Sequence, residues 1–347
     1  MTTLQDQFGR VLSYLRISVT DRCNFRCAYC MPEAGVELGP REHLLSFEEI
    51  ARVCAVGAQL GLRKVRLTGG EPTVRRDLPT LVAMLRAIEG IQELAMTTNA
   101  ARLVELASPL RDAGLDRLNI SLDTLDANKA RRITRRDTHA SVMDGIEAAH
   151  RVGFPLKFNA VVMRGVNDDE LPALARFAHH YGAQMRFIEW MPMGGVVAAQ
   201  QSAFFSTREM RARLDAEFDL VSDGGLPSPT VAGDTDSDTL CPALTVAPDP
   251  ARGWVCQRSG VRVGFISSMT EEFCATCNRM RLTAEGGLRP CLHQDAEVPL
   301  RDLLRGSASD ADLAAAFQRA ATLKWAGHHM TQFIPLYSSK NMVALGG

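Results

Sequence analysis

Six short segments of the chain either alternate apolar and polar residues or are mostly apolar. Most of them are separated by longer segments with an apolar residue at every third or fourth position. The first pattern is typical of buried or half-buried strands and the second of amphipathic helices. Strands are predicted at residues 15–19, 64–68, 94–98, 117–121, 156–162 and 184–189. Strands and helices that alternate in this way predict parallel strands with right-handed crossovers. Six repeats favour an α/β fold with an incomplete (β/α)6 TIM-like barrel, although the pattern alone also allows a doubly wound open sheet.

The first predicted helix begins at a capping box. In Ser46-Phe-Glu-Glu49, the serine hydroxyl and the glutamate carboxylate can each accept a hydrogen bond from the other residue's backbone N–H. The apolar period then continues to Leu60 and ends near Gly61. Cys54 lies on the apolar stripe, so we expect it in the core. Further helices are predicted at residues 78–88, 141–152 and 207–218.

The composition changes after the last of these helices. Residues 222–250 are rich in Gly, Pro, Ser, Thr and Asp, which predicts a long surface loop. Strand-like sequence follows at 254–266, and an Ala- and Leu-rich helical region at 303–323. The sequence therefore predicts a partial-barrel domain, a linker and a smaller α+β C-terminal domain, at residues 1–220, 221–252 and 253–347.

Composition and charge narrow the function classes. The chain has 347 residues, is 46% hydrophobic and carries a formal charge of −1, which argues against a basic surface that coats nucleic acid. The N-terminal segment MTTLQDQFGR is polar, and no apolar run reaches about 18 residues, so we expect a cytoplasmic protein without membrane contact. Nine cysteines without a secretion signal argue against a disulfide framework. Clustered cysteines then point to metal.

Three cysteines lie close together directly after the first predicted strand, in the order Cys23, Cys27 and Cys30. Three thiolates can hold an iron-sulfur cubane and leave its fourth iron without a protein ligand. An open iron favours chemistry over electron transfer alone, much as a catalytic zinc ion keeps an open position. A zinc knuckle or a disulfide loop is the alternative, but the spacing is wider than CxxC and no nearby His or Cys supplies a fourth ligand.

A second set of three cysteines occurs in the C-terminal part, at Cys274, Cys277 and Cys291. Alone, this set fits zinc about as well as iron-sulfur. Because the first set also has three cysteines, an iron-sulfur cluster is favoured for the second set too. Cys241 and Cys256 have no nearby partner and are interpreted as incidental thiols. We interpret His328-His329 as a surface feature, because neighbouring side chains of an extended segment point to opposite sides.

Unusual residues gather where the predicted strands end. Ligands of a barrel bind at the C-terminal ends of its strands. The cysteine loop has this position, and so do the segments 69–72, 97–99, 121–123 and 190–194. This shared placement predicts one site at that end of the barrel.

Taken together, these motifs resemble the GTP 3′,8-cyclase family of molybdenum cofactor biosynthesis, which belongs to the radical S-adenosylmethionine (SAM) superfamily and carries two [4Fe-4S] clusters. The similarity extends from Phe8-Gly9-Arg10 to Gly346-Gly347. The clearest departure from the family pattern is at residues 222–250, which are longer and poorer in aromatics. The matching segments are YLRISVTDRCNFRCAYCMP, KVRLTGGEP followed by Arg75-Arg76-Asp77, NISLDTLD, RFIEWMPMG and FCATCNRMRLTAEGGLRPCL.

The resemblance implies a role for each matching residue. It makes Cys23, Cys27 and Cys30 the ligands of the cluster that binds SAM, and Cys274, Cys277 and Cys291 the ligands of a second cluster. The implied SAM contacts are Tyr29, Gly70, Ser121 and Met191. The implied GTP contacts are Arg16, Arg66, Thr97, Lys157, Arg186, Arg279 and Arg281, the last two also with a catalytic role. Gly346-Gly347 would reach into the active site, whereas Arg131, Arg132, Arg135 and Arg136 are interpreted as an exposed helix face.

The resemblance also implies a reaction and partners. The reduced first cluster would split SAM, and the 5′-deoxyadenosyl radical would take hydrogen from C3′ of GTP, giving 3′,8-cyclo-7,8-dihydro-GTP. A reductant protein would supply the electron, cyclic pyranopterin monophosphate synthase would take the product, and a homodimer is possible. Two alternatives stay open: a radical SAM peptide-modifying enzyme with an auxiliary cluster, and a zinc protein that serves as an interaction or nucleic-acid module.

Overall fold

The six predicted strands lie side by side in chain order and all run parallel. The structure is a computed structural model that describes residues 3–191, 201–224, 250–328 and 342–345. The parallel strands are β1 (Tyr14–Ser18), β2 (Lys64–Thr68), β3 (Glu93–Thr98), β4 (Arg117–Ser121), β5 (Leu156–Val162) and β6 (Gln184–Glu189). The predicted partial α/β barrel is confirmed, with strand bounds within one residue of those expected from the pattern.

Strands from the C-terminal part extend the same sheet at both ends. These strands are β7 (Leu220–Ser222), β8 (Arg252–Cys256), β9 (Arg262–Ile266), β10 (Arg279–Leu282), β11 (Gly287–Arg289) and β12 (Val298–Pro299). The described strands form one 12-stranded sheet in the order β12-β11-β10-β1-β2-β3-β4-β5-β6-β9-β8-β7. Because β10 pairs with β1 and β9 with β6, both in parallel, segments distant in sequence stand next to the barrel strands.

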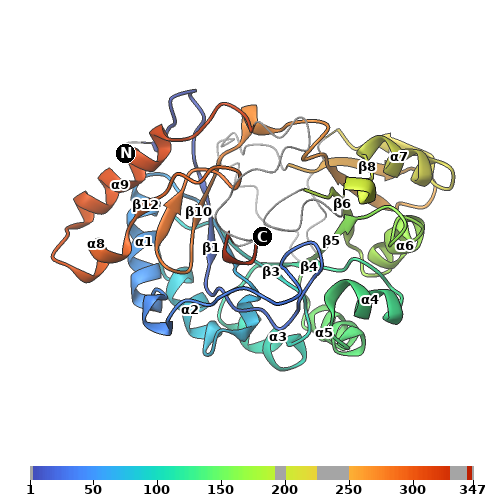
Figure 1. Ribbon diagram of the computed structural model, residues 1–347, viewed down its shortest axis with the longest axis horizontal. Helices are drawn as coiled ribbons and strands as arrows, with labels where there is room; N and C mark the ends of the chain where they lie inside the picture. Colours follow the sequence, from blue (N-terminus) through green and yellow to red (C-terminus); the bar gives the residue numbers. More distant parts are fainter. Residues whose placement is uncertain (1–2, 192–200, 225–249, 329–341, 346–347) are drawn as a thin grey trace, which may run out of the picture.

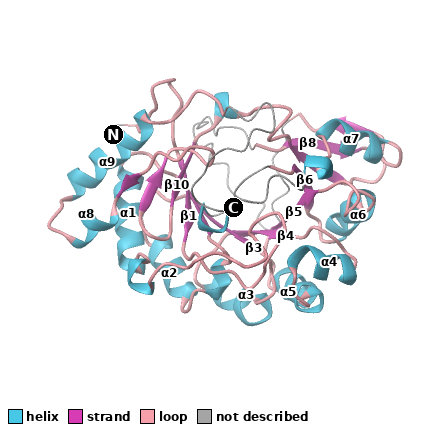
Figure 2. Ribbon diagram, in the orientation of Figure 1, coloured by secondary structure: helices cyan, strands magenta, loops and turns pink. Residues whose placement is uncertain are grey.

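All the described α-helices except the last cover the outer, convex side of the curved sheet, and the last one, at the C-terminal end, lies on the inner side (Figures 1 and 2). The helices are α1 (Phe47–Gln59), α2 (Leu78–Arg86), α3 (Leu103–Asp112), α4 (Ala127–Thr134), α5 (His139–Arg151), α6 (Leu171–His180), α7 (Thr207–Asp215), α8 (Arg301–Arg305), α9 (Asp310–Thr322) and α10 (Met342–Leu345). Capping boxes begin three of them, at Ser46, Ser206 and Ser309. The helical region predicted at 303–323 is divided into α8 and α9, because Gly306 ends the first helix and the Ser309 capping box starts the second.

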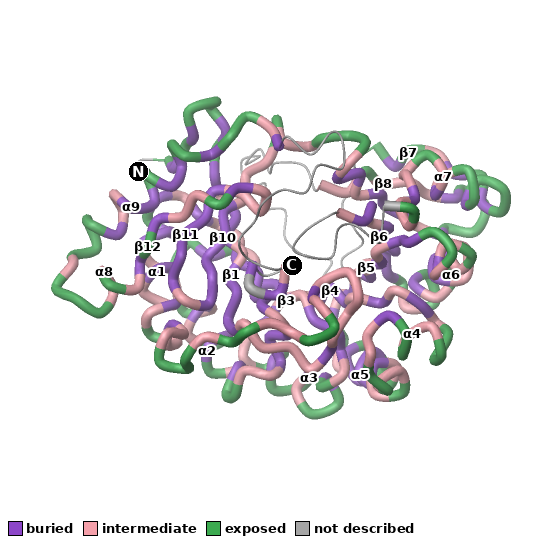
Figure 3. The backbone as a smooth tube through the Cα atoms, in the orientation of Figure 1, coloured by how far each residue is buried: buried purple, intermediate pink, exposed green. Residues whose placement is uncertain are grey.

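The hydrophobic core lies between the strands and the outer helices. Figure 3 shows that the buried residues follow the strands, while exposed residues lie on the outer helices and loops. Phe158, Phe187 and Phe265 are among the largest fully buried side chains, and Cys54 is fully buried as predicted. Among the residues that the structure describes, no helix combines the length and the apolar character needed to cross a lipid bilayer.

The predicted exposed arginine face is confirmed for three of its four residues and wrong for Arg135. Arg131, Arg132 and Arg136 are exposed, but Arg135 is partly buried and ends α4 with a φ of 54°. Its guanidinium donates hydrogen bonds to the backbone oxygens of Arg26 and Met31, both at 3.4 Å. Arg135 therefore contacts the first cysteine loop, a contact that its local sequence does not reveal.

Candidate active site

All residues predicted to bind a cluster, SAM or GTP line a single cavity of about 1060 Å³. Alternate residues of a strand point to the same face of a sheet, so residues in matching register point together. Arg16 pairs in register with Arg66 on one side and with Arg281 on the other, and Asn159 pairs with Arg186. The cavity wall is therefore built from one phase of each strand.

The first cysteine loop is held by backbone contacts on both sides. Arg26 and Ala28 donate their N–H groups to Thr134 and Ile133 at the end of α4, each at 2.9 Å. Within the loop, Phe25 donates its N–H to Cys23 Sγ at 3.3 Å. The three thiols thus have fixed positions before any metal binds.

Burial keeps these three thiols neutral. It raises the pKa of Cys23 to about 11 and that of Cys30 to about 12, and it raises the pKa of Cys27 as well. Each thiolate also opposes its neighbours, since Cys23 and Cys30 both add to the shift at Cys27. A bound cation reverses this effect, because coordination replaces the thiol protons.

The segment after β2 packs against this loop through glycine. The N–H groups of Gly70 and Glu71 donate to the backbone oxygens of Thr20 and Arg22, both at 2.8 Å. A Cβ at Gly70 would lie 2.2 Å from the Arg22 oxygen, so only glycine allows this approach. The buried Glu71 carboxylate accepts hydrogen bonds from Thr73, Thr98 and Asn99, which connects this segment to the end of β3.

The second cysteine set lies on the same cavity, beside cations. Burial alone would raise the pKa of Cys277, but Arg279 and Lys324 outweigh it and lower the pKa to about 6. Lys324 is buried, and its Nζ donates to the backbone oxygens of Arg279 and Pro290, at 2.8 and 2.7 Å. This set therefore contains one thiolate near neutral pH, in contrast to the first set.

Both cysteine sets fit the group for which they were predicted. Cys27 interacts electrostatically with Cys23 and Cys30, and Cys274 does so with Cys277 and Cys291, so each set converges. Among the described residues, no further cysteine lines the cavity. Three thiolates per set leave one iron of a cubane open on each side.

A row of cations crosses the neighbouring strands. Burial, together with Arg66 and Arg279, lowers the pKa of Arg16 to about 10, although Tyr14 opposes this. Burial, Arg16 and Arg279 hold the pKa of Arg281 well below its ordinary value. Burial disfavours ionisation of Tyr14, but the surrounding cations outweigh it and lower its pKa to about 8. Such an accumulation of positive charge fits a strongly anionic ligand.

Two polar atoms of the wall also indicate a ligand. Within the described part of the chain, Arg66 Nε and Asn159 Oδ1 are buried without a hydrogen-bond partner. Buried polar groups normally have partners, so these two are available to a bound molecule. The Arg66 guanidinium donates a hydrogen bond from its Nη1 to Thr97 Oγ1 at 3.4 Å and lies over the Tyr14 ring.

The structure adds residues that the sequence reasoning did not assign. Tyr14, Asp123, Asn159, His293 and Lys324 all line the cavity. Asp123 accepts hydrogen bonds from Tyr29 Oη and the Val161 N–H at 2.8 and 2.9 Å, and burial raises its pKa to about 6. The strand phase could have identified Tyr14 and Asn159, because each is two residues from a predicted contact.

The C-terminal segment reaches the cavity as far as it is described. Met342 and Val343 line it, and Arg281 Nη1 donates to the Leu345 oxygen at 3.0 Å. Gly346-Gly347, Cys241 and His329 lie outside the described residues. Cys256 is buried at the end of β8.

The interpretation of His328 as a surface residue is wrong. Its exposed fraction is 5%, and it lies beside Cys274 and His293 on the cavity. The sequence rule on neighbouring side chains carries no information on which distant segments cover a residue.

Comparisons with known proteins identify the family of the chain. Residues 17–178 match the radical SAM superfamily, and residues 239–330 match Molybdenum Cofactor Synthesis C. The GTP 3′,8-cyclase of Moorella thermoacetica is 45% identical over 328 residues, which cover 94% of this chain and 95% of that protein. The GTP 3′,8-cyclase of Pseudomonas putida is 44% identical over 94% of this chain and 92% of that protein.

Solved structures support the fold. Streptococcus suis SuiB has a TM-score of 0.58 at 15% identity, over 89% of this chain and 69% of that one. SuiB bound to S-adenosylmethionine has a TM-score of 0.57 at 14% identity, over 89% of this chain and 66% of that one. At such identity the likeness shows a shared architecture.

Proposed function

The chain belongs to the family of GTP 3′,8-cyclases within the radical SAM superfamily, and from this premise we propose that SAM and GTP bind together in the cavity described above. The protein is a lyase of molybdenum cofactor biosynthesis that converts GTP to 3′,8-cyclo-7,8-dihydro-GTP. One observation carries the assignment of the site: both cysteine sets and the row of cations lie on one cavity. The reaction requires SAM and GTP to meet, and a shared cavity allows this.

Membership of the radical SAM superfamily implies one [4Fe-4S] cluster and SAM as cofactors. We assign that cluster to Cys23, Cys27 and Cys30, and a second [4Fe-4S] cluster to Cys274, Cys277 and Cys291. The SAM contacts proposed are Tyr29, Gly70, Ser121 and Met191, which line the cavity together with the first cysteine loop. Bare backbone at Gly70 leaves room for a polar group of SAM to approach.

GTP carries three to four negative charges on its triphosphate, and the cations of the wall match them. Guanidinium forks suit phosphate oxygens because they donate in pairs. We assign the triphosphate and the guanine ring to a wall formed by Arg16, Arg66, Thr97, Lys157, Arg186, Arg279 and Arg281. Arg279 and Arg281, close to the second cysteine set, would act directly at the nucleotide.

The chain's own residues position the reactants. When bound, the reduced cluster and SAM supply the carbon radical that removes hydrogen from C3′ of GTP. The cation wall fixes the nucleotide, so that C3′ and C8 lie close enough to form the new bond, at about 3 to 3.5 Å. The protein walls exclude water and other hydrogen donors from this space.

The competing readings receive less support. A peptide-modifying enzyme does not explain relatives that are GTP 3′,8-cyclases over 94% of the chain. A zinc-based interaction module does not explain a radical SAM match over residues 17–178. A reductant protein and an enzyme that consumes the cyclised nucleotide follow as partners from the chemistry.

An anaerobic assay tests the proposal. Reconstituted protein receives SAM, dithionite and GTP, and 5′-deoxyadenosine and the cyclised nucleotide are both measured. Cys27→Ser should abolish both products, whereas Arg279→Ala should lower the cyclised nucleotide at least tenfold with the iron content unchanged. Arg132→Ala, on the exposed side of α4, is the control. Normal nucleotide output from Arg279→Ala would remove Arg279 from the site.

The second cluster has its own test. Cys291→Ser should lower bound iron by about half and abolish nucleotide cyclisation, because one of two clusters is lost. The first cluster would remain, so SAM should still be cleaved slowly without GTP. Full iron content in this variant would contradict the second cluster.

A further inference from the structure

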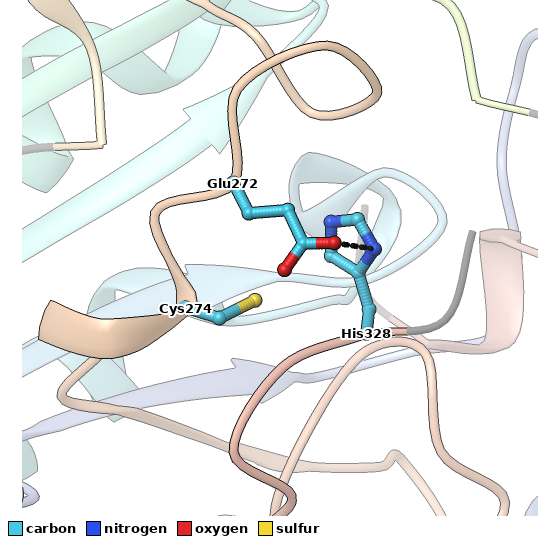
Figure 4. Close-up of side chains that lie close together, drawn as sticks. All are labelled: Glu272, Cys274 and His328. Carbon is cyan, nitrogen blue, oxygen red and sulfur yellow. Dashed lines mark ion pairs between the residues drawn. The ribbon is translucent and has the colours of Figure 1, made fainter. Parts of the chain in front are cut away.

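Glu272, Cys274 and His328 form a small cluster at the edge of the cavity. Their ligand atoms, a carboxylate oxygen, Sγ and an imidazole nitrogen, all lie within 4.8 Å of one another. Figure 4 shows the thiol and the carboxylate directed toward the same space beside the imidazole ring. His328 Nδ1 and Glu272 Oε1 are 3.5 Å apart. With metal-ligand distances of about 2.0 to 2.3 Å, ligand atoms of one tetrahedral ion lie about 3.5 Å apart.

The site is assembled from two distant segments, which Arg10 holds together. Its Nη1 donates to the Cys274 oxygen at 2.6 Å and to the Ala326 oxygen at 3.0 Å. Its Nη2 donates to the Trp325 oxygen, and Asp6 pairs with its Nε. The segment that carries Cys274 and the segment that carries His328 are therefore fixed relative to each other.

The backbone before His328 passes close to Glu272 and Cys274. A Cβ at Gly327 would lie 2.9 Å from Glu272 Oε2 and 4.0 Å from Cys274 Cβ. The His328 N–H also donates to the Cys274 thiol. His328 is buried, while Glu272 is exposed, so an ion can enter from solvent and still reach a buried nitrogen.

We propose that Glu272, Cys274 and His328 bind one divalent transition-metal ion of the Zn²⁺, Fe²⁺ or Co²⁺ class when the second cysteine set holds no cluster. One sulfur, one nitrogen and one oxygen ligand suit these ions, and three protein ligands leave a fourth position for water. Hard ions such as Mg²⁺ prefer oxygen ligands to thiolates, so we do not expect them to bind at this site.

The site shares Cys274 with the cluster proposed above, and this part of the inference rests on the proposed function. One thiolate cannot serve both a single ion and the cubane in their separate geometries. A bound ion therefore blocks assembly of the second cluster, and an assembled cluster removes the ion site. The order in which metals reach the chain then decides which form is made.

Cobalt titration of the full chain tests the ion site without SAM, GTP or any cluster. The parent variant carries Ser at positions 23, 27, 30, 277 and 291, so Cys274 is the one thiol left from the two sets. Co²⁺ should bind with a thiolate charge-transfer absorption that Cys274→Ser abolishes. His328→Gln should weaken binding about tenfold or more, and His179→Gln, exposed on α6, should not change it.

A second measurement does not depend on the His328 variant folding. In the parent variant labelled with ¹⁵N-histidine, pulsed electron paramagnetic resonance of bound Co²⁺ should detect a directly coordinated nitrogen. Absence of that coupling, absence of the charge-transfer band, or equal affinity in folded His328→Gln would each overturn the ion site. These results are independent of cyclase activity, so failure of one proposal does not imply failure of the other.

The competition with the cluster is tested in the unmodified chain. Zn²⁺ added before reconstitution should lower iron uptake by about half, and His328→Gln should restore it. Unchanged iron uptake after Zn²⁺ would show that the ion and the cluster do not compete, and that part of the inference would be wrong.

Discussion

At the scale of single residues, burial and local partners decide which charges this protein tolerates. Glu71 is buried and accepts several hydrogen bonds, so its carboxylate connects loops. Arg10 is buried beside Asp6 and donates to three backbone oxygens. Burial raises the pKa of Glu71 despite its donors, and it raises that of Asp123, which two donors reach, to about 6.

Asp123→Asn should therefore change how stability depends on pH. The folded pKa of Asp123 lies above its unfolded value of 3.8, so the protonated form stabilises the fold below about pH 4, and this contribution is lost as pH rises to about 6. Relative to Asp123→Asn, the cluster-free wild type should lose about 2 kcal/mol of unfolding free energy across this interval, a value reduced because Asp123 is only partly buried.

Urea unfolding of the two cluster-free proteins at pH 4, 5, 6 and 7 measures this difference. The asparagine variant is the reference for the wild type, because every other titrating group is common to both proteins. If the unfolding free energies of the two proteins differ by the same amount at all four pH values, the pKa of Asp123 is not raised.

At the scale of elements, the site depends on loops that pack against one another at the ends of strands. The segment after β2 meets the first cysteine loop at Gly70, and the end of α4 meets it at Arg135. These contacts involve backbone atoms, so there is little space for a larger side chain. The loops are consequently positioned by sterics as much as by hydrogen bonds.

Gly70→Ala should displace the cysteine loop. The added Cβ would lie 2.2 Å from the Arg22 oxygen and 2.5 Å from its carbonyl carbon. These are backbone atoms, which cannot move away by a side-chain rotation. We expect bound iron of the first cluster to fall at least twofold and SAM cleavage to fall at least tenfold, as for misplacement of about 1 Å. Both are measured after anaerobic reconstitution.

Gly39→Ala is the matched control. Its Cβ would approach only the flexible Glu285 side chain, at 2.7 Å, so that side chain can move away. Wild-type iron content and SAM cleavage in Gly70→Ala would show that the close approach is unimportant for the site.

At the scale of the whole molecule, the sheet brings cations from both ends of the chain into one row. β10 stands beside β1, so Arg281 of the C-terminal part lies in register with Arg16. Like charges that are buried together destabilise the empty fold, and a bound polyanion offsets this cost. Under the proposed function, the cation row lowers the stability of the empty protein and favours the binding of GTP.

Arg16→Met should stabilise the empty protein and weaken GTP binding. Removing one half-buried cation should raise the unfolding free energy of the cluster-free protein by about 1 kcal/mol, since the pKa of Arg16 is lowered to about 10 by burial and its neighbours. The same variant should bind GTP at least tenfold more weakly, because a charge-assisted hydrogen bond is lost.

Arg10→Met provides the contrast. Arg10 is buried, and its partners are a carboxylate, that of Asp6, and three backbone oxygens, so its loss should cost about 3 kcal/mol. Thermal unfolding and GTP titration of both variants check the two effects. An Arg16→Met protein with a lower unfolding free energy than the wild type would refute the idea that the cation row destabilises the empty protein.

The sequence by itself determined the features that depend on near neighbours in the chain. Apolar alternation predicted all six barrel strands, and the capping box predicted the start of α1. The spacing of the cysteines defined the two cysteine sets. Strand phase then accounts for why Arg16 and Arg66 share a wall, because side chains alternate with a period of two. These signals are local, so they can be read without knowing how the chain folds.

Tertiary structure decided which distant segments meet. The placement of β10 beside β1, the contact of Arg135 with the cysteine loop and the burial of His328 beside Cys274 all join segments far apart in sequence. No periodicity records such contacts, since they depend on strand order and on which side chains cover a site. For this reason the sequence identified the chemistry, and only the fold showed that both cysteine sets face a single cavity.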